Sequence, residues 1–325
     1  MIYISLPENT IRRLSFYLSM EEYIARHLDE DEAFFMWQVN PTVIFGRNQL
    51  MENEVNLEYV NKHGIETYRR KSGGGCVYAD PSNIMFAYIT KDKNVGFTFN
   101  KYLRKVSDVL QQLGVDAQPS GRNDITINNK KVSGNAFFKV AGKSIVHGTM
   151  LFNTDLEVMV KAITPNNEKL ISKGVESVRK RVTNLSEHLD IDIETFKTFV
   201  RTHLCDSERV LTDKDIANIE EIEKEYLSHE FIFGNNPRYT IIKKAYNEAG
   251  EIEIRLEIKN DIIKGINIVG DYFLVGDIDE GLLKRLINTP YNKDAVRSEL
   301  QHIKMEDYIH NLTKNRFMEI LFNDK

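Results

Sequence analysis

Residues 124–152 read DITINNKKVSGNAFFKVAGKSIVHGTMLF, and the predicted fold class follows most directly from them. Residues 125–127 and 131–138 are β-rich, and the Asn-Asn pair between them is typical of a tight hairpin turn. Residues 143–152 form a third β-rich run. The stretch therefore predicts three strands, of which the first two fold back on each other.

Helical and β-rich runs alternate irregularly before this stretch. Apolar residues recur at helical spacing over residues 9–28, with Asn9 or Thr10 as the expected N-cap. Residues 34–39 and 42–45 are β-rich and separated by an Asn-Pro pair, which predicts a hairpin or a bent strand. Further strands are expected over residues 64–68, 77–78 and 83–90, and an amphipathic helix over residues 99–113.

Helical patterns dominate residues 153–230, and the loop-like segment FIFGNNPRY at residues 231–239 marks the expected domain boundary. Strands of a small sheet are then expected over residues 239–246, 251–259 and 262–269, followed by two or three helices between residues 279 and 322. Strands mixed with segregated helices, without a regular βαβ rhythm, predict an α+β fold. We therefore expect a large domain over residues 1–238 and a small accessory domain over residues 239–325.

The composition excludes several classes of protein. Hydrophobic residues make up 42% of the chain and charged residues 28%, as in ordinary globular proteins. The formal net charge of -5 gives no general attraction to nucleic acid or to an anionic membrane. Cys76 and Cys205 lie far apart, which predicts neither a disulfide framework nor a zinc site. Without a signal-like N-terminus or an apolar run of about 20 residues, a cytoplasmic location is expected.

A basic, glycine-rich loop, RRKSGGG, occupies residues 69–75. Glycines let the backbone approach a ligand and turn its N–H groups inward, while Arg and Lys supply charge for a phosphate or carboxylate. The loop matches neither G-x-x-x-x-G-K-[ST] nor G-x-G-x-x-G, and the chain continues as a strand rather than a helix. This pattern predicts an anion site of an unusual kind, and a solvated basic turn is the alternative.

A second cluster surrounds the Asn-Asn turn. If the chain folds back there, Asp124 and Lys131 lie near each other, and the lysine can neutralise a phosphate. Alternation places Lys131 and Ser133 on one strand face, with Lys130 and Val132 on the other. The alternative is an exposed hairpin edge whose lysines oppose aggregation.

Three further side chains, His147, Cys76 and Trp37, have chemistry that a site could use. His147 closes a strand, and a lone histidine there is more often structural than catalytic. Cys76 follows the basic loop, so a lowered pKa is one expectation for its thiol, and burial as a small hydrophobic residue is the other. Trp37, within FFMWQV, is expected in the core.

Six segments together resemble the lipoate–protein ligase family. They are RRKSGGGCVYAD (residues 69–80), GRNDITINNKKVSGNAF (121–137), HGTML (147–151), FGRNQ (45–49), KGVESVRKRVTNL (173–185) and FGNNPRY (233–239). The resemblance extends over about residues 1–240, and the remainder is similar in size and pattern to the family's accessory domain. One departure is Ala79, which stands where the family pattern often has His before the Asp of the loop.

The resemblance implies a mixed-sheet, biotin/lipoyl-ligase-type catalytic domain with a small α+β accessory domain. It also implies two half-reactions: lipoate and ATP, with Mg²⁺, give lipoyl-AMP, and the lipoyl group then passes to a lysine of an acceptor. Expected acceptors are apo lipoyl domains of 2-oxoacid dehydrogenases or the glycine cleavage H protein. Octanoate is a further candidate substrate. A monomer without a tightly bound prosthetic group, nucleic acid or membrane partner is expected.

The resemblance also implies the site residues. Lys131 would be the catalytic residue, in contact with both the lipoate carboxylate and the α-phosphate, and Arg70 would bind the activated intermediate. Asp124 would assist Mg²⁺. The expected nucleotide contacts are Gly75, Cys76, Val77 and Tyr78, and the expected lipoate contacts include Ser72, Gly74, Gly75, Asn83, Ser133 and Thr149.

Three other functions compete with this hypothesis. An ATP-independent octanoyl or lipoyl transferase requires a nucleophilic thiol, for which Cys76 and Cys205 are the candidates. A biotin ligase is disfavoured because its G-R-G-R-R-G-x-x-W loop is missing. The third alternative is a non-catalytic module that binds carrier proteins, against which the joint presence of Arg70, the three glycines and Lys131 argues.

Overall fold

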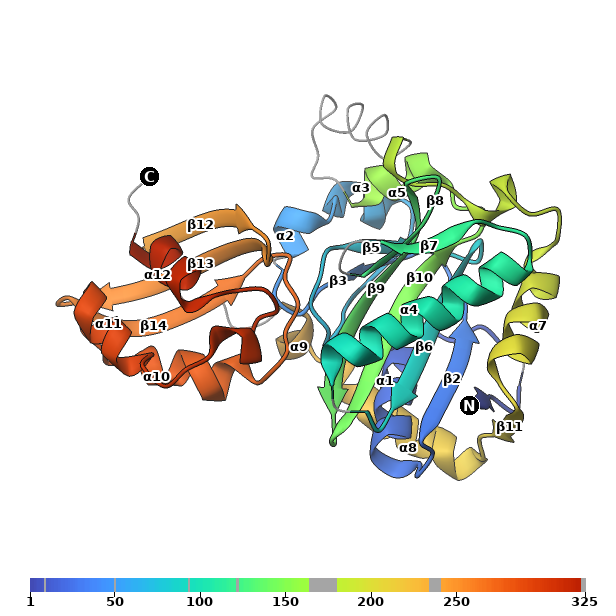
Figure 1. Cartoon of the computed structure of the whole chain (residues 1–325), viewed down its shortest axis with the longest axis horizontal. Helices are drawn as coiled ribbons and strands as arrows, with labels where there is room; N and C mark the ends of the chain where they lie inside the picture. The colour runs from blue at the N-terminus through green and yellow to red at the C-terminus, as the bar shows by residue number, and fades with distance from the viewer. Residues whose placement is uncertain are drawn as a thin grey trace. The chain divides into compact units, whose positions relative to one another are not determined.

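A computed structural model describes residues 1–8, 10–49, 51–92, 94–120, 123–163, 180–233 and 241–322. Its elements, drawn in Figure 1, are β1 (Ile2–Ser5), α1 (Leu14–His27), β2 (Glu32–Trp37), β3 (Thr42–Phe45), α2 (Met51–Glu54), α3 (Leu57–Lys62), β4 (Glu66–Arg69), β5 (Val77–Ala79), β6 (Asn83–Thr90), α4 (Val95–Gln112), β7 (Ala117–Ser120), β8 (Asp124–Ile127), β9 (Lys130–Val140), β10 (Lys143–Leu151), α5 (Leu156–Ala162), α7 (Ile193–Leu204), β11 (Ser207–Val210), α8 (Asp213–Tyr226), α9 (His229–Phe233), β12 (Ile241–Asn247), β13 (Gly250–Lys259), β14 (Ile262–Val269), α10 (Lys284–Leu286), α11 (Lys293–Glu299) and α12 (Lys314–Phe322).

The chain forms two compact units. The first comprises Met1–Phe45, Met51–Arg70 and Cys76–Ile232, and the second comprises Gly46–Leu50, Lys71–Gly75 and Phe233–Lys325. The boundary expected between residues 238 and 239 lies outside the described residues. Two short segments from the first third of the chain thus belong to the C-terminal unit.

An eight-stranded mixed sheet organises the first unit, in the order β11-β1-β2-β6-β10-β9-β8-β7. β1 runs parallel to both β2 and β11, whereas the other pairs are antiparallel. Helices α1 and α8 cover one face, and α4 and α7 the other (Figure 1). Every residue of β6 and β10 is buried because both faces are covered. The predicted mixed-sheet α+β fold is confirmed.

A second, three-stranded sheet of the first unit has the order β4-β3-β5. β3 therefore does not pair with β2, and of the two expectations for these runs, a hairpin or a bent strand, the hairpin is wrong. Helix α1 also begins later than expected, at Leu14, where Arg13 is the N-cap and makes no side-chain cap hydrogen bond. Other helices do begin at side-chain caps: Asp155 for α5, Asp192 for α7 and Thr212 for α8.

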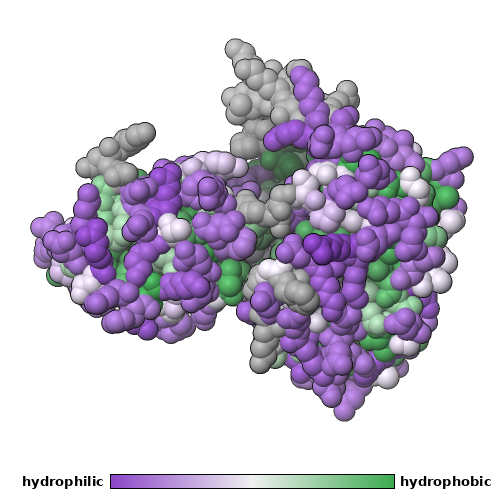
Figure 2. Space-filling model, in the orientation of Figure 1, coloured by the Kyte–Doolittle hydropathy of each residue, from purple (hydrophilic) through white to green (hydrophobic). Residues whose placement is uncertain are grey.

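The second unit contains the antiparallel sheet β12-β13-β14. All three strands were predicted, and Ile252 and Ile254 of β13 and Ile263, Ile266 and Ile268 of β14 belong to a core shared with α11 and α12. Hydrophilic residues cover much of the described surface in the view of Figure 2. Among the described residues, none of the helices is long and apolar enough to cross a membrane.

Candidate functional site

Lys131 and Asp124 form an ion pair across the β8–β9 hairpin, as predicted. The distance between Nζ and Oδ1 is 2.8 Å, and the two side chains are 40% and 32% exposed. Asn128 and Asn129 in the turn have φ values of 50° and 63°. These are the left-handed conformations that a tight hairpin turn requires. The hairpin thus holds a solvent-accessible cation beside a carboxylate.

Gly134 determines where the Lys131 side chain lies. Gly134 pairs with Asp124, and a Cβ atom at Gly134 would lie 2.5 Å from Cε and 2.6 Å from Nζ of Lys131. Such distances are far shorter than van der Waals contact. The lysine therefore crosses the bare backbone of Gly134 to reach Asp124.

A register shift in β8–β9 changes the predicted arrangement of faces. Ile125 pairs with Ser133 and Thr126 with Lys131, so Val132 is the extra residue of a β-bulge. Because adjacent residues of β8 point to opposite faces, Lys131 and Ser133 do so as well. The expectation that they share a face is wrong. Ser133 is buried, and its Oγ accepts a hydrogen bond of 3.1 Å from Nδ2 of Asn135.

The Asp124 face continues across the sheet as a row of directly paired residues. Asp124 pairs with Gly134, Gly134 with Thr149 on β10, Thr149 with Met85 on β6, and Met85 with Trp37 on β2. Paired residues of neighbouring strands lie on the same face. The row therefore passes from an ion pair, through a glycine and a threonine, to buried apolar side chains.

The adjacent row on the same face is apolar except for one histidine. It consists of Ala136, His147, Ala87 and Phe35. Nδ1 of His147 lies 2.7 Å from Oε2 of Glu21 on α1, and both side chains are buried. Burial raises the pKa of Glu21, and the nearby His147 opposes the rise. The Glu21–His147 pair was not predicted from the sequence. The available signal was Glu21 itself, because a carboxylate on the buried face of a helix usually has a polar partner.

Trp37 is buried, as expected, and its ring stacks on Tyr17 at a centroid distance of 4.8 Å. Its Nε1 atom and the Nδ2 atom of Asn83 are both buried without a hydrogen-bond partner. Asn83 is the first residue of β6, two positions before Met85, so it shares the Asp124 face. Two buried donors on this face thus have no hydrogen-bond partner among the described residues.

Arg70 lies directly after β4, beside β3. It is buried, its backbone N–H donates to the carbonyl of Phe45 at 3.1 Å, and its Nη1 donates to the carbonyl of Ile44 at 3.2 Å. The neighbouring Arg69 guanidinium lies over the Phe45 ring, 4.6 Å from its centroid. These contacts place both arginines next to the sheet formed by β3, β4 and β5.

Cys76 precedes β5, which contains Val77 and Tyr78. Burial raises the pKa of the Cys76 thiol to about 12, and the charge of Glu54 adds to the rise. The expectation of a lowered pKa is therefore wrong. Burial likewise raises the pKa of Cys205 to about 11. Neither thiol is a ready nucleophile near neutral pH, because the thiolate is the reactive form.

Two other groups of predicted residues are not described together with Lys131 and Asp124. Ser72, Gly74 and Gly75 belong to the second unit. Within residues 173–185, positions 173–179 lie outside the described residues, as do Gly121 and Arg122. The described end of that segment reaches the site, because Val182 forms a β-bridge with Lys131. The described parts of the chain contain no cluster of three His, Cys, Asp or Glu side chains suited to a metal ion.

Comparison with known families matches both parts of the chain. The model of the lipoyl protein ligase A/B catalytic domain matches residues 14–205, and that of the bacterial lipoate protein ligase C-terminus matches residues 236–321. A lipoate-protein ligase of Bacillus subtilis is 36% identical over 94% of this chain and 96% of its own length.

Solved structures share the fold. P. falciparum LipL1, in complex with lipoate, has a TM-score of 0.76 at 19% identity and covers 98% of this chain and 97% of its own. A bipartite lipoate protein ligase described with its E2 lipoyl domain from Thermoplasma acidophilum has a TM-score of 0.64 at 28% identity, over 74% and 98% of the chains. A lipoate-protein ligase A bound with ATP has a TM-score of 0.63 at 26% identity, over 72% and 98%.

Proposed function

This chain belongs to the lipoate–protein ligase family, and from that premise we propose how its residues activate and transfer lipoate. In the first step a carboxylate oxygen of lipoate bonds to the α-phosphorus of ATP, and pyrophosphate leaves. In the second step the amine of an acceptor lysine bonds to the acyl carbon, loses a proton, and AMP leaves. Both steps take place at the polar end of the Asp124 face.

The sheet face that carries Lys131 is the observation that supports this assignment best. Lipoate has a carboxylate at one end and an apolar chain at the other. The face has the same order, from the Lys131 ammonium over Gly134 and Thr149 to Met85. Burying an apolar chain there contributes about 0.8 kcal/mol per CH₂ group. Octanoate fits the same description and is a second candidate substrate.

Lys131 supplies charge where two anions must meet. A carboxylate that approaches an α-phosphate brings negative charges together, and a pre-placed cation stabilises both the ground state and the transition state. We assign Arg70 to the same phosphate, and Cys76, Val77 and Tyr78 to the nucleotide. Mg²⁺ would supply further positive charge, with Asp124 as its candidate ligand. The acceptor would be an apo lipoyl domain or H protein, and the enzyme a cytoplasmic monomer.

Changing Gly134 to alanine tests the geometry of the lysine. The new methyl group would displace Cε and Nζ of Lys131, so we expect lipoate-dependent ATP–pyrophosphate exchange to fall about tenfold. The melting temperature should change little, because the end of a lysine side chain moves at low cost. Gly96→Ala, in the first turn of α4, is the matched control and should leave exchange unchanged. Normal exchange in Gly134→Ala would contradict the assigned position.

Changing Cys76 to serine separates the ligase from an acyltransferase. Because burial holds the thiol protonated, we expect Cys76→Ser to retain most ligase activity. The measurement is mass spectrometry of an apo lipoyl domain incubated with lipoate and ATP, and separately with an octanoylated donor protein without ATP. ATP-independent transfer that Cys76→Ser eliminates would establish the acyltransferase mechanism instead.

A further inference from the structure

The glycine-rich loop Lys71–Gly75 and the segment Gly46–Leu50 are structural parts of the C-terminal unit. The two segments are joined by their backbones, since the N–H of Arg47 donates to the carbonyl of Ser72 at 3.0 Å. A second hydrogen bond, of 2.9 Å, runs from the N–H of Gly270 to the carbonyl of Asn48. The loop is therefore held by residues from distant parts of the sequence.

Tyr272 contacts the loop directly through its backbone. Its carbonyl accepts a 2.9 Å hydrogen bond from the N–H of Gly74, whose φ of 89° is one that glycine adopts readily. A Cβ atom at Gly73 would lie only 2.1 Å from the same carbonyl oxygen. Gly73 therefore leaves room for the Tyr272 carbonyl, and Gly74 donates the hydrogen bond to it. While the contact persists, the N–H of Gly74 is occupied.

Asp271 places a negative charge against the same loop. Its Oδ2 atom lies 3.1 Å from the position that a Cβ atom of Gly75 would take. Inward-turned backbone N–H groups bind anions, so a carboxylate at this distance opposes the approach of another anion by like-charge repulsion. Tyr272 and Asp271 thus occupy or shield the groups that an acyl-adenylate would use.

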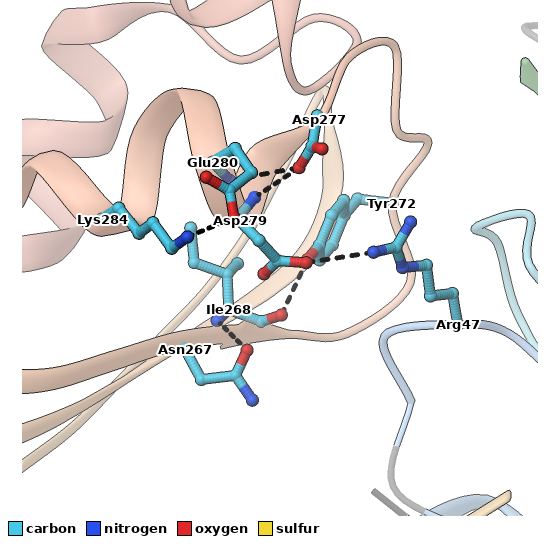
Figure 3. A network of polar contacts seen from close by, with 8 residues as sticks. All are labelled: Arg47, Asn267, Ile268, Tyr272, Asp277, Asp279, Glu280 and Lys284. Atoms are coloured by element: carbon cyan, nitrogen blue, oxygen red, sulfur yellow. Dashed lines mark hydrogen bonds and ion pairs between the residues drawn. The ribbon is translucent and has the colours of Figure 1, made fainter. Parts of the chain in front are cut away.

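An ion pair strengthens this docked arrangement. Nη2 of Arg47 lies 3.0 Å from Oδ2 of Asp279, with side chains 42% and 57% exposed (Figure 3). Oδ1 of Asp277 accepts the backbone N–H groups of Asp279 and Glu280, each at 3.1 Å, which orients the turn that carries Asp279. Tyr272 is itself fixed, because its buried hydroxyl donates to the carbonyl of Ile268 at 2.7 Å.

We propose that Asp271 and Tyr272 compete with the anionic ligand for the glycine-rich loop, and that the Arg47–Asp279 ion pair sets the strength of this competition. The proposal rests on the proposed function, together with the expectation from the family resemblance that Ser72, Gly74 and Gly75 contact lipoate and that Gly75 also contacts the nucleotide. The loop exchanges between a state docked on Tyr272 and a released state that accepts the ligand. The C-terminal unit thereby acts as a built-in competitor.

Asp279→Asn tests the ion pair through two measurements on the full chain. Amide hydrogen exchange at Gly74 reports release of the loop without ligand, and calorimetric titration with lipoyl-AMP reports affinity. Half-exposed ion pairs contribute little, so we expect exchange to accelerate and the Kd to fall, each by about two- to five-fold. Asp271→Asn should also lower the Kd, because it removes the carboxylate beside Gly75.

Glu280→Gln is the matched control. Glu280 lies in the same turn but pairs with Lys284, so both measurements should stay at wild-type values. Unchanged Gly74 exchange in Asp279→Asn, or a higher Kd despite faster exchange, would overturn the proposal. Failure of the wild-type protein to bind lipoyl-AMP at all would instead refute the proposed function, and the exchange measurement would still report loop docking.

Discussion

Replacing Lys131 with alanine is expected to abolish lipoate-dependent ATP–pyrophosphate exchange. The ammonium is the cation beside Asp124 at the polar end of the substrate face. Removing one electrostatic contact of this kind commonly costs about 3–4 kcal/mol of transition-state stabilisation, or roughly two to three orders of magnitude in rate. The fold should survive, because the ion pair is partly exposed and such pairs contribute about 0–1 kcal/mol to stability.

The control for this experiment is Lys130→Ala. Lys130 is the preceding residue of β9, is exposed, and pairs with Ile127 on the opposite face from Lys131. Loss of exchange in Lys131→Ala alone, with both variants melting near the wild-type temperature, would support the assignment. Unchanged exchange in Lys131→Ala would remove Lys131 from the mechanism. Transfer from presynthesised lipoyl-AMP then reports separately on the second step.

The sequence predicted those elements whose structure is determined by neighbouring residues. The Asn-Asn turn, with both residues in left-handed conformations, identified the β8–β9 hairpin and the Asp124–Lys131 contact. By contrast, β7 and β11 were not predicted. β7 has one buried residue of four, and β11 lies mostly exposed at the edge of the sheet. Short edge strands lack the alternation on which sequence interpretation depends.

Two features of the site required tertiary structure. The β-bulge that separates Lys131 from Ser133 arises from pairing with β8, and strict alternation cannot foresee an inserted residue. The row from Asp124 to Trp37 joins three consecutive strands, β8, β9 and β10, to β6 and β2, which lie much earlier in the chain. The placement of Lys71–Gly75 in the C-terminal unit was likewise hidden, because the contacting Tyr272 lies far along the chain.

Replacing Glu21 with alanine should lower the free energy of unfolding by about 3 kcal/mol. Nδ1 of His147 would lose its 2.7 Å contact with the carboxylate, and the missing atoms would leave space within a closely packed region. Urea denaturation with both circular dichroism and fluorescence as probes would measure the loss. A change below about 1 kcal/mol would show that the Glu21–His147 contact contributes little to stability.

The glutamine variant tests the charge of Glu21 at nearly constant shape. Burial raises the folded-state pKa of Glu21 above the ordinary value of 4.5, so the unfolded chain releases this proton first as pH rises. The stabilising contribution of the protonated carboxyl is therefore complete below about pH 4.5 and is lost as pH rises through the folded-state pKa. Glutamine does not titrate. The unfolding free energy of Glu21→Gln minus that of the wild type should thus increase as pH rises above about 4.5. A difference that is constant or decreases would show that Glu21 ionises in the folded protein at least as readily as in water.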